Sequence, residues 1–173
     1  MRSAAAFRIL LALLVASGLA AIPSAVSADT QGPTTLWQRA RVIQVIDGDT
    51  VDVQMAGGAK RRVRLVGIDT PEVYDGVECG GKEASASLKR LLPRGTRVRL
   101  ISDPTQARMD QYGRLLRYVT KSSTGVDMNR KQVWSGWARL YVYKDDPFKR
   151  VSSYRKAQRS ADAHDRGIWN LCR

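Results

Sequence analysis

A short segment of the chain combines an apolar run with charged residues of both signs. It reads Arg64-Leu65-Val66-Gly67-Ile68-Asp69-Thr70-Pro71-Glu72. Apolar residues alternate with Arg64, which is typical of a strand, and Pro71 must end that strand because it has no N–H to donate. The segment predicts a strand that carries Arg64 in its body and three polar residues at its end: Asp69, Thr70 and Glu72. Taken alone, the pattern fits a surface salt bridge at a β-turn more simply than a functional site.

A second acidic group, Asp47-Gly48-Asp49-Thr50, precedes this segment. Asp-Gly is above all a turn signal, so the simplest interpretation is a tight hairpin. Asp49 fits a hairpin less well because it opens a strand, where Asp is depleted. If the two strands are neighbours, Asp49 and Asp69 would lie close together, and with water and a backbone carbonyl they would suit Ca²⁺ or Mg²⁺ and not zinc.

A second arginine, Arg114, begins another predicted strand after Gly113. Phosphodiester cleavage requires a metal ion to neutralise phosphate, a base to activate water, and guanidinium groups to hold the charge that builds on phosphorus. Glu72 is the best candidate for the base because it adjoins the predicted metal site without being an obvious ligand. No single residue here is specific for this chemistry, but the set together predicts it.

The elements that must position these residues follow from hydrophobic periodicity. The first strand starts near Arg41, and Gly57-Gly58 predicts a hairpin that pairs Val51–Met55 with Arg61–Ile68. Further strands are predicted at 96–101, 113–119 and 137–144, and helices at 82–92, 127–134 and 147–163. We expect an α+β protein whose five main strands close into an OB-fold β-barrel, a fold that commonly binds oligonucleotides.

Composition points to an anionic partner. Among 173 residues, 29 Lys and Arg face 16 Asp and Glu, so the formal net charge is +13, while 43% of residues are hydrophobic. That hydrophobic content excludes a disordered chain and supports one domain. The charge favours nucleic acid or an anionic membrane or envelope surface, and composition does not separate these partners.

The N-terminal segment predicts export. Arg2 and Arg8 precede a short apolar run, and small residues follow it, so cleavage is expected after Ala28. An uncleaved membrane anchor is the alternative, but the run is shorter than the ~20 residues that a spanning helix needs. We expect a signal peptide at 1–28, a flexible leader at 29–38 and one domain at 39–173. The protein would be secreted or periplasmic, without a stable membrane anchor, and a monomer.

Export changes the interpretation of Cys79 and Cys172. In an oxidising compartment, a pair without a third cysteine is a candidate disulfide. A structural zinc site is excluded because it needs four ligands, and the chain has a single histidine besides these two thiols.

In motif order and spacing, the chain resembles the staphylococcal-nuclease-like (thermonuclease) family from about Arg41 to Trp169. The matching segments are Asp47–Thr50, Arg64–Glu72, Asp110–Arg114, Tyr141–Lys144 and Gly167–Trp169. The resemblance implies an OB-fold barrel with three helices and Ca²⁺-dependent hydrolysis of DNA and RNA.

The resemblance also implies individual roles. Asp49 and Asp69 would bind Ca²⁺ through their side chains, and Thr70 through its carbonyl. Glu72 would act on the attacking water as a general base or by orienting it, and Arg64 and Arg114 would clamp the scissile phosphate. Three tyrosines would bind the neighbouring nucleotide: Tyr112, Tyr141 and Tyr143. Gln111 replaces a lysine of the family's best-known member, which removes a cation near a terminal phosphate.

Two alternatives come from other classes of protein. A non-catalytic OB module would hold single-stranded nucleic acid by charge and stacking, but it should lack some of the catalytic residues. A cationic envelope-binding protein would explain the charge and the export signal, but it leaves the carboxylates unexplained. All five polar residues of the predicted site are present in the chain: Asp49, Arg64, Asp69, Glu72 and Arg114.

Overall fold

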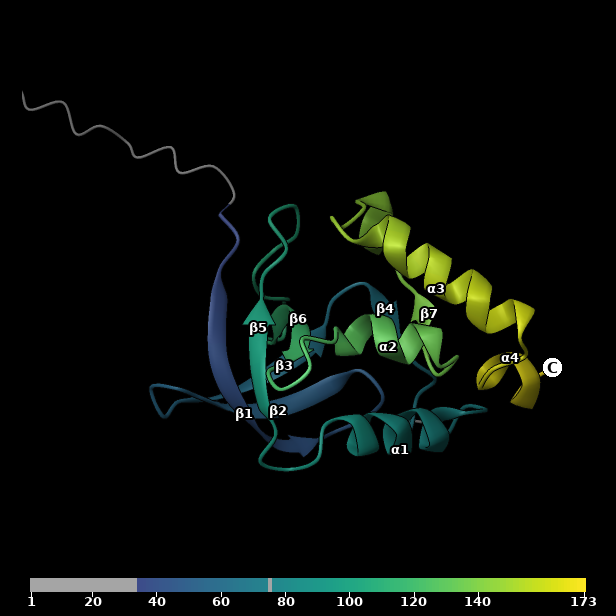
Figure 1. Ribbon diagram of the computed structural model, residues 1–173, viewed down its shortest axis with the longest axis horizontal. Coiled ribbons are helices and arrows are strands. Elements are labelled where there is room, and N and C mark those ends of the chain that lie inside the picture. The colour runs from purple at the N-terminus through teal and green to yellow at the C-terminus, as the bar shows by residue number, and fades with distance from the viewer. Residues whose placement is uncertain (1–33, 75) are drawn as a thin grey trace, which may run out of the picture. The chain divides into compact units, whose positions relative to one another are not determined.

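A computed structural model describes residues 34–74 and 76–173 (Figure 1). The predicted signal peptide, with cleavage after Ala28, lies outside these residues, as does the beginning of the leader. Within the described ranges, no helix is both long and apolar enough to cross a membrane.

The core of the fold is a closed β-barrel. Its strands in the described residues are β1 (Trp37–Val45), β2 (Thr50–Met55), β3 (Lys60–Leu65), β5 (Arg97–Ile101) and β6 (Leu115–Lys121). They close in the order β1-β2-β3-β6-β5, with β3 and β6 parallel and the other pairs antiparallel. The predicted α+β fold with a five-stranded OB-type barrel is therefore confirmed.

The first strand begins inside the predicted leader, two residues before the expected domain boundary at 39. Trp37 pairs with Ile101 and Gln38 with Leu100, so β5 supplies ladder partners for both residues. Pairing with a strand so distant in the chain cannot be seen in the local pattern, which is why the predicted leader is too long.

The predicted strand Arg61–Ile68 is divided in two. β3 ends at Leu65, a turn follows, and β4 (Ile68–Asp69) pairs with β7 (Arg139–Leu140) outside the barrel. Gly67 makes the turn with φ of 79°, and a Cβ there would lie 2.5 Å from the Phe148 ring. Glycine adopts this positive φ without strain and leaves room for the Phe148 ring. The break in the strand also directs Asp69 out of the barrel wall.

The predicted strand at 137–144 was wrong in its extent. Only β7 (Arg139–Leu140) is extended and paired, because β4 offers just two residues as partners. The backbone N–H of Tyr141 still donates to the carbonyl of Gly67 (3.1 Å), and a 3-10 turn follows at Tyr143–Asp145.

The helices are α1 (Gly81–Leu91), α2 (Met128–Trp134), α3 (Val151–Ala163) and the short α4 (Ile168–Leu171). The first two match the predicted helices to within a residue, whereas α3 begins four residues later than the predicted start at 147. Asp127 caps α2 as expected by accepting a hydrogen bond from the Arg130 N–H (3.1 Å). Figure 1 shows α2 and α3 side by side, where they contact each other. The core joins residues of the barrel to these helices: Val51, Val53, Val63, Leu65, Leu88, Val98, Leu100, Val119, Val133 and Tyr154.

Candidate active site

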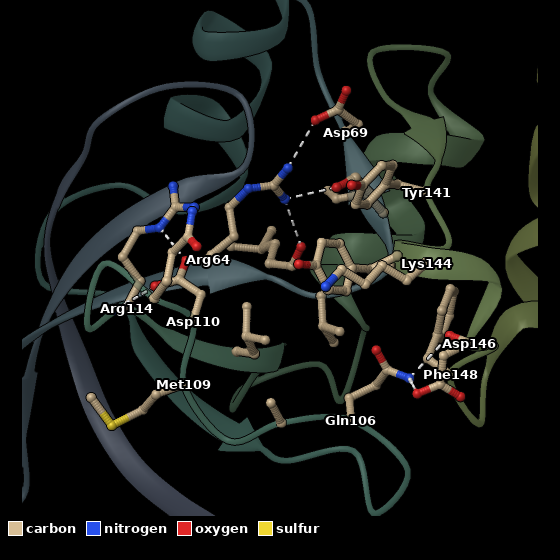
Figure 2. Close-up of a pocket in the computed structure, with 18 of the residues that line it drawn as sticks. Arg64, Asp69, Gln106, Met109, Asp110, Arg114, Tyr141, Lys144, Asp146 and Phe148 are labelled. Carbon is tan, nitrogen blue, oxygen red and sulfur yellow. Dashed lines mark hydrogen bonds and ion pairs between the residues drawn. The ribbon is translucent and has the colours of Figure 1, made fainter.

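A pocket of about 750 Å³ opens on the side of the barrel formed by β3, β4 and the start of β6 (Figure 2). Six residues predicted from the sequence line it: Arg64, Asp69, Tyr112, Arg114, Tyr141 and Tyr143. Residues from widely separated parts of the chain therefore meet around one cavity.

Arg64 is the central side chain of the pocket wall. Its Nη1 donates to the carbonyls of Leu65 (3.0 Å) and Ile68 (2.7 Å). Its Nη2 donates to Asp69 Oδ1 (2.9 Å), and its Nε is ion-paired with Asp49 Oδ1 (3.0 Å). Among the described residues, one Nη2 N–H has no partner and is available to a ligand. One guanidinium thus connects both predicted metal-binding carboxylates.

Asp49 is almost completely buried, with 6% of its surface exposed. Burial raises the pKa of Asp49 to about 7, Arg64 opposes this rise, and the neighbouring charge of Asp47 adds to it. Its Oδ2 accepts hydrogen bonds from the Thr70 backbone N–H (3.2 Å) and hydroxyl (3.1 Å). The carboxyl group is therefore held in one position by donors on several sides.

Thr70 packs directly over the turn that carries Asp49. A Cβ on Gly48 would lie 2.7 Å from the Thr70 hydroxyl oxygen, so glycine is required for this close approach. The Asp47-Gly48-Asp49 turn is therefore both the predicted hairpin turn and a structural part of the site. The two interpretations of this motif do not exclude each other.

The donor set fits a hard divalent cation. Asp69 keeps 56% of its side chain exposed and contributes one oxygen that Arg64 does not bind. Asp49 and Asp69 are both carboxylates, and the backbone carbonyl of Thr70 follows directly in the chain. Within the described residues, no three His, Cys, Asp or Glu side chains form a group able to hold a metal. Water and substrate oxygens would have to complete the coordination, which is usual for Mg²⁺ and acceptable for Ca²⁺.

Glu72 lies outside the lining of the pocket and is exposed. Partial desolvation raises the pKa of Glu72, and the charges of Asp47, Asp69 and Glu78 add to the rise. A carboxylate close to other acids and with a raised pKa is better suited to accept a proton than an ordinary surface glutamate.

The loop that follows Glu72 is held from two sides. The Glu72 backbone carbonyl accepts from the Glu78 N–H (3.0 Å), and a Cβ on Gly81 would lie 2.3 Å from that same carbonyl. A disulfide joins Cys79 to Cys172, with the Cα atoms 5.8 Å apart. The C-terminus is thereby linked to the loop that carries Glu72, and glycine at position 81 lets α1 begin against it.

Arg114 approaches the pocket from the loop that precedes β6. Asp110 accepts hydrogen bonds from its Nε (2.6 Å) and its backbone N–H (2.9 Å). Neither Nη group has a hydrogen-bond or ion-pair partner among the described residues, and 30% of the side chain is exposed. The ring centre of Tyr112 lies 5.3 Å from the guanidinium carbon. Arg114 therefore presents an open pair of nitrogens, the geometry that matches a phosphate.

The rim of the pocket carries the exposed tyrosines, which are 74%, 45% and 53% exposed at Tyr112, Tyr141 and Tyr143. Such rings are available to a base or sugar of a bound ligand. Lys144 also lines the pocket, together with Gln111. A cation is thus present in the same cavity although position 111 carries none.

Sequence reasoning missed two contributors to this site. Asp110, which holds Arg114, lies in the matching segment Asp110–Arg114 but has no predicted role, although its spacing of four residues from Arg114 is visible in the sequence. Gly81 had no sequence signal, since its contact with the Glu72 carbonyl depends on how α1 starts.

Comparison with known proteins gives consistent matches. Residues 62–171 match the family described as staphylococcal nuclease homologue. The chain is 37% identical over 137 residues to a thermonuclease of Staphylococcus hyicus, covering 77% of this chain and 76% of that protein. It is 37% identical over 147 residues to a thermonuclease of Staphylococcus intermedius, covering 83% and 80%. It is also 32% identical over 138 residues to endonuclease YhcR of Bacillus subtilis, covering 75% of this chain and 11% of that protein.

Proposed function

Because the chain belongs to the staphylococcal nuclease homologue family, we propose that it is a nuclease that hydrolyses phosphodiester bonds of DNA and RNA with Ca²⁺. The relatives named thermonuclease and endonuclease support a hydrolase of this class. The observation that carries the proposal is the convergence of Arg64, Asp69 and Arg114 on one pocket, with the buried Asp49 ion-paired to Arg64.

Asp49, Asp69 and the Thr70 carbonyl would hold Ca²⁺. When bound there, the ion would supply positive charge to the scissile phosphate and bring water close to it. The exposed oxygen of Asp69 and the fixed carboxylate of Asp49 support this assignment.

The arginines would hold the phosphate itself. Arg114 has both Nη groups available and can bind two phosphate oxygens, while Arg64 offers its remaining Nη2 N–H in the same pocket. Charge that develops on the phosphate oxygens in the transition state would be stabilised by these preoriented donors. Glu72 would accept the proton of the attacking water, and its raised pKa supports that role.

We also propose export to the periplasm or the medium. The support is the N-terminal sequence together with the Cys79–Cys172 disulfide, which persists in oxidising compartments. N-terminal sequencing of the protein recovered from a bacterial host should begin at Asp29. A protein retained with its first residues intact would contradict the proposal.

The direct test is digestion of DNA and RNA by the purified protein with Ca²⁺ and then with a calcium chelator. Both substrates should be degraded with Ca²⁺, and chelation should stop cleavage. Glu72→Gln should lower turnover by about 10²–10⁴-fold, as expected for loss of a general base.

Glu83→Gln is the matched control, because Glu83 is an exposed glutamate on α1 outside the pocket. It should leave turnover unchanged. If Glu72→Gln behaves like this control, the base assignment is wrong. If the protein binds single strands but never cleaves them, it is the non-catalytic OB module instead.

A further inference from the structure

The outer face of the barrel opposite β3 carries arginines in an unusual arrangement. Arg39 and Arg41 on β1 face outward, and so do Arg97 and Arg99 on β5. The strand register places Arg39 directly opposite Arg99 and Arg41 directly opposite Arg97. We call these four residues the arginine ladder.

Directly opposed like charges destabilise an antiparallel pair. On the neighbouring strands, by contrast, Arg62 on β3 lies opposite Asp52 on β2 and pairs with it (2.8 Å). None of the ion pairs in the described part of the chain involves the arginine ladder. Within the same residues, the ladder side chains make one hydrogen bond, from Arg41 Nη1 to the Gly95 carbonyl (2.9 Å). That hydrogen bond does not neutralise the four opposed charges, so an external anion is the partner that would balance them.

An aromatic side chain extends the ladder. Trp37 lies two residues before Arg39 on the same face of β1, is 61% exposed, and has the Arg39 guanidinium carbon 6.0 Å from its ring centre. Successive outward residues on a strand are about 6.6–6.8 Å apart, which is comparable to the spacing of phosphates along a nucleic acid strand. A stacking surface beside a regular row of cations is the arrangement that binds single-stranded nucleic acid without sequence preference.

The ladder is separate from the catalytic pocket. In the closed strand order, β2 lies between β3 and β1, and β6 lies between β3 and β5. Figure 1 shows β1 and β5 next to each other and away from β4 and β7. None of the four arginines, nor Trp37, lines the pocket.

We propose that the arginine ladder and Trp37 form a second nucleic-acid-binding surface, which holds the phosphate backbone and one base of a strand outside the catalytic pocket. The proposal rests on the proposed nuclease function for the identity of the ligand. Guanidinium groups favour it, because they bind phosphate oxygens in pairs and stack on planar groups. A long strand would contact both surfaces, and a short one only the pocket.

The test measures binding of a fluorescent single-stranded DNA of about 30 nucleotides, in chelator, as a function of salt. The test variant carries Arg39→Gln, Arg41→Gln, Arg97→Gln and Arg99→Gln. The control variant removes four exposed positive charges, one just before α3 and three on it. Its substitutions are Lys149→Gln, Arg155→Gln, Lys156→Gln and Arg159→Gln. Both variants have the same net charge, so a general effect of charge cancels.

The ladder variant should bind at least about tenfold more weakly than the control variant at low salt. Its slope of log K against log salt should fall by roughly 0.7 for each phosphate that the protein no longer neutralises, or about 2–3 in all. Trp37→Ala should weaken binding of single strands at least about fivefold and leave duplex binding unchanged. Thermal unfolding of the ladder variant should occur at or above the wild-type temperature, since repulsion is removed.

Equal weakening in the two charge variants, or none in the ladder variant, would overturn the proposal. Loss of binding to anionic phospholipid vesicles with DNA binding intact would overturn it in favour of a lipid surface. Cleavage of a trinucleotide with Ca²⁺ separates the two proposals. The ladder variant should cleave it at the wild-type rate, whereas failure of the wild type to cleave both this trinucleotide and long DNA or RNA would remove the nuclease function and leave the binding result to stand alone.

Discussion

Arg64 and Arg114 line the same pocket but are held in opposite ways. Arg64 projects from the barrel, is 15% exposed, and donates to two backbone carbonyls and to Asp69, with Asp49 ion-paired to its Nε. Arg114 stands on a loop, is 30% exposed, and is held by a single residue, Asp110. The first belongs to the packing of the protein, and the second is positioned locally.

The difference separates two demands on a phosphate-binding site. A mostly buried arginine such as Arg64 keeps the acidic side of the pocket together and has one N–H left for a ligand, so it combines structural and binding roles. A half-exposed arginine with both Nη groups free can bind phosphate in a bidentate way, although it has less support. Substitutions at the two positions should therefore differ in kind: loss of Arg64 should cost stability as well as activity, and loss of Arg114 mainly activity.

The largest effect is expected for Arg64→Ala. Removing one partner of a buried ion pair typically costs about 3–5 kcal/mol, because the other charge is left without compensation. Asp49, with 8% of its side chain exposed, would be that charge. Thermal and denaturant unfolding should show the loss of stability, and nuclease activity should fall by more than about 10³-fold. A variant that is inactive yet as stable as the wild type would show that Arg64 has no structural role.

The next effect is expected for Arg114→Ala, which should lower turnover by about 10²–10³-fold through the loss of charge stabilisation. Its unfolding temperature should fall only slightly, because the side chain makes one partly exposed ion pair, with Asp110, and its Nη groups contact no other described residue. Arg155→Ala, at an exposed position on α3, is the matched control and should alter neither quantity. A large loss of stability in Arg114→Ala would remove the distinction between the two arginines.

A smaller effect is expected for Asp110→Asn. The neutral side chain would keep the shape of the loop but weaken its hold on Arg114, so kcat should fall by about tenfold through misplacement. The two residues act through one interaction, so Asp110→Asn should have little further effect when Arg114 is already alanine. Additive losses in the double variant would show that Asp110 acts independently of Arg114.

The sequence predicted the Arg64 side of the pocket better than the Arg114 side. Alternation around Arg64 placed it on a strand, and the Gly57-Gly58 hairpin put that strand beside the one that Asp49 precedes. The strand register confirms that these two strands are neighbours, since Thr50 pairs with Arg64. Local periodicity and turn chemistry carry this information, because the contact forms between strands adjacent in the chain.

Contacts between distant segments were not predictable in the same way. The parallel pairing of β3 with β6, which brings Arg114 toward Arg64, leaves no mark in either strand's own pattern. In the sequence, Gly67 resembles an ordinary glycine in an apolar run, because the Phe148 ring that packs against it comes from a distant segment. The Cys79–Cys172 bond is an exception, because export predicts it and the position of Cys79 shortly after Glu72 means that it joins the C-terminus to the Glu72 loop.

The smallest expected effect is a dependence of stability on pH at Asp110, the residue that holds Arg114. Burial opposes the change, but hydrogen bonds and the charge of Arg114 lower the pKa of Asp110 below its ordinary value. A carboxyl group whose folded pKa is lowered stabilises the protein above its unfolded pKa, near 3.9, and loses that stabilisation as pH falls through the folded pKa. The stability difference between wild type and Asp110→Asn should therefore be constant from pH 7 to about pH 5 and shrink below about pH 4. Unfolding temperatures of both proteins across that range measure it, and a difference that stays constant down to pH 2 would show that the carboxylate of Asp110 does not hold Arg114 through its charge.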